Sequence, residues 1–400
     1  MANEQQLALL KKGVNVWNEW REKNPETRPD LREAELQKED LGGVNLMEAD
    51  LRSCDLSGAN LMGATLRFCD LRGANLSQAY LSNADFSEAN LCEANLSEAY
   101  LFEANLSRVN LNGADLQWAY LGQADLSGTY AIEANLSEAD LRGAYLLGTN
   151  LSDANLRGAN LSGADLQAAD LRRANLDKVN LMGARLLKTN FEDANLTGCS
   201  IYGISCWELN LQGAKQSNLE IAPPGEPGIA VDNLEVAQFI YLLLNHKKIR
   251  QILNTVPSEI VLVLGNFTSA ERKDILNVIR DRLRLRSYLP VVFDLDKPAD
   301  RDFTETISCL ANMARFIIVD LTDASGISQQ LQHLAFQQKR VPVQPLVQAT
   351  SGECDLFEDG QPYPWLLQTY RYRDLEELTV SLEEKALAIV EAKARELMKR

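Results

Sequence analysis

Residues 34–63 read AELQK EDLGG VNLME ADLRS CDLSG ANLMG, and the same five-residue pattern continues to Gly213 without an insertion. The third residue of each of the thirty-six blocks is Leu, Phe or Ile, except at Ala131 and Cys206. The residue two positions earlier is Ala in 24 blocks. Because helices repeat every 3.6 residues and strands every two, neither element accommodates this period. The chain must therefore turn a corner in every block.

Four blocks close a square coil of about twenty residues, and successive coils stack at the ~4.8 Å spacing of paired strands. About nine coils then form a rod roughly 43 Å long, with Leu and Ala inside and Gly, Ser and Asn at the corners. Burial of the Leu side chains of one coil does not offset the conformational entropy that its twenty residues lose on folding. We therefore expect the coils to fold cooperatively rather than singly.

The blocks match the signature A(D/N)LXX, and this region resembles the pentapeptide-repeat family. That resemblance implies a right-handed quadrilateral β-helix, a handedness that the period alone does not give. The predicted fold class is thus a mainly β solenoid, with an α/β doubly wound parallel-sheet domain following it. The predicted domains are an N-terminal helical cap at 1–28, the β-helix at 29–215, a Pro/Gly linker at 216–231 and the α/β domain at 232–400.

The cap is predicted from apolar residues at helical spacing, which are Leu7, Leu10, Val14 and Trp17, with Trp20 close by. They indicate one amphipathic helix over residues 4–23, which the segment NPETRPDL ends before the first coil. Such a helix covers the open edge of the first coil, where unpaired backbone groups would otherwise promote association. A helix lying on a membrane surface is the alternative, but Glu and Lys mix on its polar face.

Composition excludes several classes of function. No run approaches the ~20 apolar residues of a membrane span, and the N-terminus lacks a secretory signal, so a cytoplasmic protein is expected. Seven scattered cysteines and two histidines give no disulfide framework, no metal site and no catalytic triad. No cofactor is expected. The net charge of −16 argues against direct binding of nucleic acid.

The charge is concentrated in the repeats, where residues 29–213 hold 26 acidic and 13 basic residues. Ten acids and one base lie between Asp85 and Asp140, whereas bases dominate residues 172–188. Stacked positions differ by twenty residues, so surface columns are read directly from the sequence. One column holds Tyr80, Tyr100 and Tyr120, and the column two residues earlier holds Glu98, Trp118 and Glu138.

Exposed Trp and Tyr amid charge are typical of binding hot spots, so these six residues are the predicted protein-binding face. The alternative is that the tyrosines stack only for stability. Some members of the family inhibit DNA gyrase by imitating DNA. A DNA rod of this length carries about 25 negative charges, twice the net charge of these repeats, so DNA mimicry is a minor hypothesis.

After Asn233, short apolar strands alternate with helices, which predicts a doubly wound parallel sheet. Ligands of such sheets bind beyond the carboxyl ends of the strands. The predicted ligand-binding residues there are Gly265, Asn266, Asp294, Asp320 and Asp323. For Asp320 and Asp323, which could bind a ribose or a metal, capping of the next helix is the favoured role. Neither G-x-G-x-x-G nor a Walker A sequence occurs.

The VDLTD strand and the helix after it resemble Toll/interleukin-receptor (TIR)-like and deoxyribosyltransferase-like domains. The resemblance implies a catalytic glutamate in that helix, but Gln329 and Gln330 stand there instead. A neutral amide is neither nucleophile nor counter-charge, so no catalytic residue is predicted. A non-enzymatic regulator with a protein partner is favoured over an NAD or nucleotide hydrolase, and homodimer formation stays open.

Overall fold

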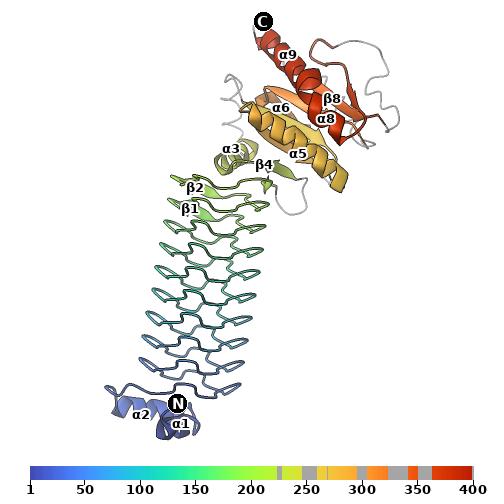
Figure 1. Ribbon diagram of the computed structural model, residues 1–400. Coiled ribbons are helices and arrows are strands. Elements are labelled where there is room, and N and C mark those ends of the chain that lie inside the picture. Colours follow the sequence, from blue (N-terminus) through green and yellow to red (C-terminus); the bar gives the residue numbers. More distant parts are fainter. Residues whose placement is uncertain are drawn as a thin grey trace. The chain divides into compact units, whose positions relative to one another are not determined.

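The structure is a computed structural model of the chain. It describes residues 1–222, 228–245, 259–267, 269–294, 304–322, 341–349 and 363–398. Two compact units make up the chain, and they are called here the repeat unit (Met1–Ser217) and the α/β unit (Asn218–Arg400). Figure 1 labels the helices and strands of both units.

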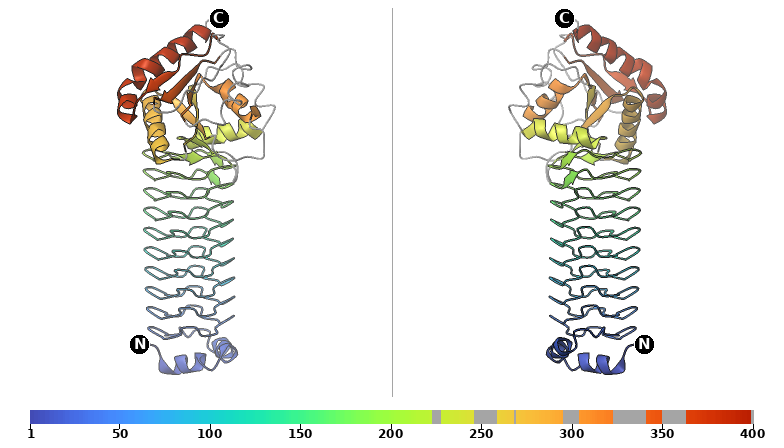
Figure 2. Two further views of the ribbon diagram at one scale, coloured as in Figure 1. Left: turned by 90° about the vertical axis from the view of Figure 1, so that its right-hand side faces the viewer. Right: turned by 90° about the vertical axis from the view of Figure 1, so that its left-hand side faces the viewer.

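Coils of twenty residues stack along the repeat unit, as Figures 1 and 2 show. Residues twenty positions apart form parallel bridges, and Tyr80 pairs with Tyr100 in this way. The Leu81 amide donates to the Tyr100 carbonyl at 2.8 Å, and the Tyr100 amide donates to the Ala79 carbonyl at 2.9 Å. The bridges confirm the predicted period of four blocks. Because these bonds join neighbouring coils, each coil depends on the next one for its backbone partners.

Large and small apolar side chains fill the interior of the coils, where Leu96 and Ala94 are fully buried. Burial of each Leu contributes about 1.5–3 kcal/mol. Three buried threonines replace Ala, and each hydroxyl donates to a backbone carbonyl, as Thr129 does to Leu106 at 2.6 Å. These hydrogen bonds remove the cost of burying a hydroxyl group.

Each block ends in a corner that its polar residues build. The Asn95 Oδ1 accepts from the Ser97 amide at 3.0 Å, and Glu98 then has a φ of 58°. A left-handed residue other than Gly costs roughly 1–2 kcal/mol, which the stacking of coils must offset. Only β1 (Arg185–Leu187) and β2 (Ser205–Trp207) extend to three-residue strands in the repeat unit, and they pair in parallel.

Two helices cover the first coil, α1 (Glu4–Leu10) and α2 (Val14–Lys23), where the sequence predicted a single helix. The prediction was wrong at Gly13, whose φ of 118° breaks the helix. Polar side chains of α2 bond to the open edge of the coil. The Trp17 indole donates to the Asn45 carbonyl at 2.8 Å, while Asn18 accepts from the Asn45 amide at 2.8 Å and donates to the Gly43 carbonyl at 3.0 Å. Side chains of α2 therefore pair the backbone of this edge at Gly43 and Asn45.

A sheet of seven strands in the order β3-β4-β6-β5-β7-β8-β9 forms the α/β unit. Its strands are β3 (Leu219–Glu220), β4 (Ile229–Val231), β5 (Ile260–Gly265), β6 (Leu289–Asp294), β7 (Phe316–Asp320), β8 (Val343–Gln348) and β9 (Tyr370–Tyr372). The five strands from β5 to β9 are parallel and lie in the order 2-1-3-4-5 of their sequence, which is the flavodoxin-like order.

Two strands extend this sheet beyond β6: β4 pairs antiparallel with β6, and β3 pairs antiparallel with β4. They lie within residues 216–231, which the sequence predicted as a linker before a purely parallel sheet. The described parts of this segment are not a linker, because Leu219, Ile221, Ile229 and Val231 are buried. The prolines and glycines at 223–228 are typical of a linker, and they interrupt the alternating apolar residues that form the two strands.

Helices lie on both faces of the sheet (Figure 2). One face carries α5 (Ala270–Leu285) and the C-terminal run of α8 (Leu375–Leu382), a π-helical turn η1 (Glu383–Leu387) and α9 (Ala388–Met398). The other face carries α3 (Leu234–Asn245) and α6 (Thr304–Met313). Ile275 and Ile279 of α5 pack with Leu378 and Leu382 of α8 in the core. The helix predicted over residues 327–338 lies outside the described residues.

Candidate functional site

Three tyrosines form a stack on the surface of the repeat unit. The ring centroids of Tyr80 and Tyr100 are 5.1 Å apart, those of Tyr100 and Tyr120 are 4.9 Å apart, and the rings are within 7° of parallel. All three side chains are exposed. The stack arises because identical residues recur at intervals of twenty, which places one ring on each of three consecutive coils.

Trp118 lies two residues before Tyr120 on the same coil, and its side chain is 52% exposed. Glu98 and Glu138 occupy the same corner position one coil before it and one coil after it. The structure thus brings together all six residues of the predicted binding face. Glu98 accepts a hydrogen bond from the Gln78 side chain at 3.0 Å.

Phe102 extends this face on the other side of the tyrosine stack, and the sequence analysis missed it. A Cβ added at Gly122 would lie 3.3 Å from the Phe102 ring, so the ring lies over this glycine. The exposed Phe102 follows Tyr100 by two residues. The sequence signal for this ring is the column of residues 82, 102 and 122, in which Gly122 leaves room for Phe102. The aromatic face is defined here as Tyr80, Tyr100, Phe102, Trp118 and Tyr120.

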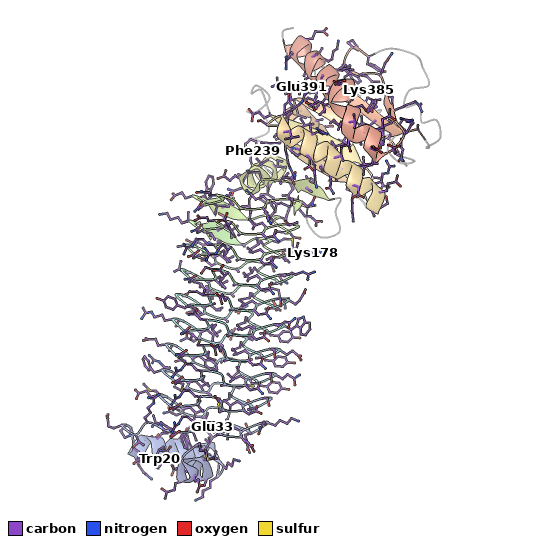
Figure 3. The ribbon with its side chains drawn as sticks, viewed as in Figure 1. Trp20, Glu33, Lys178, Phe239, Lys385 and Glu391 are labelled. Carbon is purple, nitrogen blue, oxygen red and sulfur yellow. The ribbon has the colours of Figure 1, made fainter. Side chains whose placement is uncertain are left out.

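On the coils that carry the aromatic face, seven acidic side chains have no ion-pair partner. The seven acids from residue 93 to residue 138 all lack a base within 4.0 Å, although the structure describes this whole stretch; they are Glu93, Glu98, Glu103, Asp115, Asp125, Glu133 and Glu138. By contrast, four of the five bases at residues 172–188 form ion pairs, and Arg173 lies 2.5 Å from Asp153. Lys178, labelled in Figure 3, has no such pair. The coils that carry the aromatic face therefore hold more unpaired negative than positive charge.

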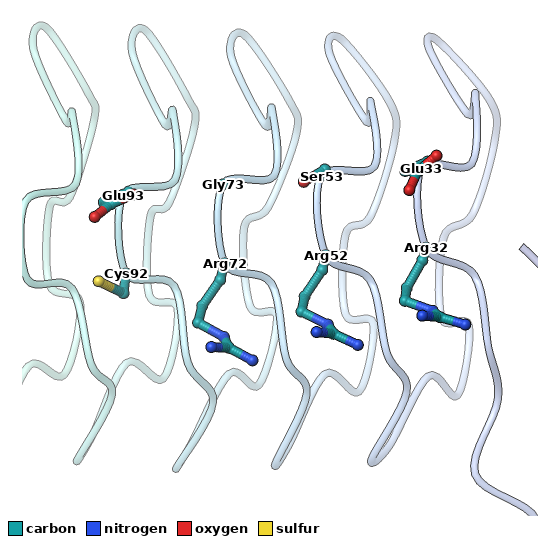
Figure 4. Close-up of a pocket in the computed structure, with 8 residues that line it drawn as sticks. All are labelled: Arg32, Glu33, Arg52, Ser53, Arg72, Gly73, Cys92 and Glu93. Atoms are coloured by element: carbon teal, nitrogen blue, oxygen red, sulfur yellow. The ribbon is translucent and has the colours of Figure 1, made fainter. Parts of the chain in front are cut away.

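A row of arginines on the first coils was not predicted from the sequence. Figure 4 shows Arg32, Arg52 and Arg72 in equivalent positions on consecutive coils, followed by Cys92. Each guanidinium forms two hydrogen bonds with the aspartate two residues earlier, and Arg32 bonds Asp30 at 2.7 and 2.9 Å. Hydrogen bonding to Arg32 lowers the pKa of Asp30 to about 2. Since every guanidinium is neutralised, this groove offers no net positive charge to an anion.

In the α/β unit, the end of β5 is filled by the protein's own side chains. A Cβ added at Gly265 would lie 2.6 Å from the Phe267 ring, which is buried over it. The Phe267 amide donates to Asp294 Oδ1 at 3.3 Å. Asp294, a predicted ligand-binding residue, therefore holds the loop after β5. Asn266 lies half-buried in the same loop.

Asp320 belongs to a buried polar network at the ends of β7, β8 and β9. Arg272 of α5 donates to Asp320 at 3.3 Å and to the Tyr372 hydroxyl at 3.1 Å, and it also bonds Gln348. The Thr322 amide donates to Asp320 Oδ1 at 3.0 Å. Burial raises the pKa of Asp320, and its bonds to Thr322 and Arg272 oppose that rise.

The predicted ligand site is therefore occupied by a salt bridge at Asp320, while Asp323 lies outside the described residues. Sequence reasoning missed Arg272, Gln348 and Tyr372 because they come from three distant elements. Among the described residues, no three His, Cys, Asp or Glu side chains are grouped so as to hold a metal ion. In the same part of the chain, none of the helices is both long and apolar enough to cross a membrane.

Comparisons with known proteins concern the repeat unit. A family model described as pentapeptide repeats matches in eight copies between residues 30 and 215. HetL, a pentapeptide repeat protein involved in heterocyst differentiation regulation from the cyanobacterium Nostoc, is 32% identical over 49% of this chain and 95% of its own, with a TM-score of 0.30.

Two further solved structures are similar to this chain. A pentapeptide repeat protein from the Arabidopsis thaliana thylakoid lumen is 31% identical over 25% of this chain and 69% of its own, with a TM-score of 0.24. QnrB1, a plasmid-mediated fluoroquinolone resistance protein, is 21% identical over 45% of this chain and 90% of its own, with a TM-score of 0.26. No curated protein matches the chain.

Proposed function

Since the chain belongs to the pentapeptide-repeat family, we propose that it is a non-enzymatic scaffold or regulator that binds a protein partner through the aromatic face of its repeat unit. The observation that carries this proposal is the exposed tyrosine stack with Trp118 and Phe102 beside it. Aromatic side chains at such density supply most of the energy of protein interfaces. Their rigid stacking means that little conformational entropy is lost when a partner binds.

The α/β unit supports the non-enzymatic part of the proposal through its buried network. Asp320 ends β7, where a doubly wound sheet presents its catalytic or ligand-binding groups. Its carboxylate is buried against Arg272 and so is not free to attack a substrate. We propose that this unit, which resembles TIR-like domains, senses a ligand or self-associates without cleaving NAD. Incubation of the full-length protein with NAD tests this, and the expected result is no consumption above background.

Quantitative affinity capture tests the proposed binding face. Full-length protein with Tyr100→Ala and Trp118→Ala is compared with the unaltered protein and with Tyr145→Ala, which removes another exposed tyrosine elsewhere on the repeat unit. The expected result is that specific partners are lost, by at least tenfold, only in the Tyr100→Ala and Trp118→Ala protein. Equal recovery of the same partners from all three proteins would contradict the assignment of this face.

A further inference from the structure

We infer that Trp118, together with Glu98 and Glu138, forms a binding site for an arginine side chain of the protein partner. This inference rests on the proposed function and adds to it the chemistry that the partner must present. It is carried by three features of the face: an indole that no other ring covers, two carboxylates in the same column, and the absence of an internal base to fill the site.

The tyrosine stack and Trp118 offer different surfaces to a cation. A cation is attracted to the face of an aromatic ring and not to its edge. Both faces of Tyr100 are covered, because the rings of Tyr80 and Tyr120 stack on it at 5.1 and 4.9 Å. Trp118 forms no ring contact within its own unit, and it is 52% exposed. The outer faces of Tyr80 and Tyr120 adjoin the neutral Asn60 and Asp140, which is already paired with Arg142. Trp118 instead lies in a column with two carboxylates that have no ion pair, so its indole attracts an approaching cation most strongly.

The two carboxylates beside Trp118 are free to receive a positive charge. Glu98 bonds only to the neutral Gln78 side chain, and neither Glu98 nor Glu138 has an ion-pair partner. One coil separates each of them from Trp118, which corresponds to about 5 Å along the column. Glu138 lies over Gly158, where a Cβ would come within 2.6 Å of its carboxyl carbon. Gln78 and Gly158 lie one coil further from Trp118, so both carboxylates are turned away from the indole here. Glu98 and Glu138 are exposed, and rotation about their side-chain bonds brings the carboxylates to a cation stacked on the indole.

No base of the repeat unit fills this site. Arg142 forms bonds of 2.6 and 2.8 Å with Asp140. Arg108 lies 3.9 Å from Glu88 and belongs to a different corner of the coil. Between residues 93 and 138 Arg108 is the single base against seven acids. No base of the repeat unit therefore competes for the carboxylates in the column of Trp118.

Arginine fits these groups better than other cations. Its planar guanidinium stacks on an indole face and still donates two parallel hydrogen bonds to a carboxylate at its edge. A lysine ammonium offers a point charge without the stacking plane. A metal ion would need more oxygen ligands at bonding distance than two carboxylates on separate coils provide. Nucleic acid is repelled by the unpaired acids.

Trp207 provides an internal control on the same unit. Its side chain is 60% exposed, but its neighbour in the column is the apolar Leu187. The adjacent Glu208 lies 3.6 Å from Lys188 and is thus already paired. Trp207 shares the exposure of Trp118 and lacks its free carboxylates. A ligand that recognises only exposed indole would bind both.

Fluorine NMR of the full-length protein labelled with 5-fluorotryptophan tests the inference. The probe is the peptide acetyl-Gly-Arg-Gly-Arg-Gly-amide, and its neutral counterpart has citrulline in place of both arginines. The resonance of Trp118 is identified by its loss in Trp118→Phe. We expect it to shift with saturation by the arginine peptide, while Trp207 shifts little. Glu98→Gln with Glu138→Gln should weaken binding about fivefold or more, and the lysine peptide should bind more weakly.

Three outcomes would overturn the inference: no shift of Trp118, an equal shift with the citrulline peptide, or equal shifts of Trp118 and Trp207. These outcomes are distinct from failure of the proposed function. Capture of the partners can depend on Tyr100 and Trp118 while the arginine peptide leaves the Trp118 resonance unchanged. In that case the face binds protein without recognising arginine. If neither responds, the binding face itself is wrong.

Discussion

Leu96 and Ser97 are neighbours in sequence and opposite in environment, since Leu96 is fully buried and Ser97 lies at a corner. We expect Leu96→Asp to unfold the repeat unit, because an unpaired carboxylate would lie among apolar side chains. Ser97→Asp should change stability by about 0.5 kcal/mol or less, since Asp177 already occupies the same column. Thermal unfolding followed by circular dichroism measures both, and equal losses would contradict the assigned phase of the repeat.

Buried thiols report on the opening of coils. Burial raises the pKa of Cys54, Cys69 and Cys199 to about 12. At pH 8 only about one such thiol in ten thousand is ionised, and the thiolate is the reactive form. We expect iodoacetamide to modify the half-buried Cys92 first, and the three buried cysteines only when denaturant opens the coils. Mass spectrometry of the alkylated peptides measures this order; simultaneous modification of all four would show that the coils open without denaturant.

At the scale of single elements, α2 closes the repeat unit through side chains rather than backbone. Asn18→Leu keeps a similar volume and removes two hydrogen bonds to the first coil. The expected loss in the free energy of unfolding is about 1–3 kcal/mol, with faster hydrogen exchange at the Asn45 amide. The control is Asn15→Leu, because Asn15 is exposed on the same helix. An equal loss in the control would assign the effect to helix propensity.

The buried salt bridge between α5 and β7 gives a second prediction for elements. Arg272→Met leaves Asp320 buried without its charge partner, which should cost about 3–5 kcal/mol. Because burial raises the pKa of Asp320, protonation as the pH falls below neutral should recover part of this loss. Chemical denaturation at pH 7 and pH 5 measures both effects. Arg373→Met is the control, because its pair with Glu377 lies at the surface and contributes little to stability.

Across the whole molecule, register is the property that holds the repeat unit together. Insertion of one residue near position 96 shifts every later Leu out of the interior, whereas insertion of twenty residues adds a coil and preserves the pairing. We expect the single insertion to abolish folding and the longer one to be tolerated. Soluble yield and circular dichroism measure this, and similar damage from both would contradict the stacked-coil architecture.

The contrast between the two units explains what the sequence predicted and what it did not. Coil, interior and aromatic column follow from one period, because residues that touch are always twenty positions apart. In the α/β unit, Arg272 bonds to Tyr372 although a hundred residues separate them. Such a contact cannot be predicted from a sequence repeat. Strands β3 and β4 were missed for the same reason, since a pair of two or three residues becomes visible only beside the sheet that it extends.

The bonds between coils run along the axis of the repeat unit, and this direction has a mechanical consequence. When force is applied to the two ends of this unit, it bears on the outermost bonds first, so the coils should detach one after another rather than together. Each event frees twenty residues, which corresponds to roughly 65–70 Å of extended chain. In an optical trap the repeat unit should therefore lengthen in equal steps at low force. When the force is lowered, it should shorten reversibly through the same steps.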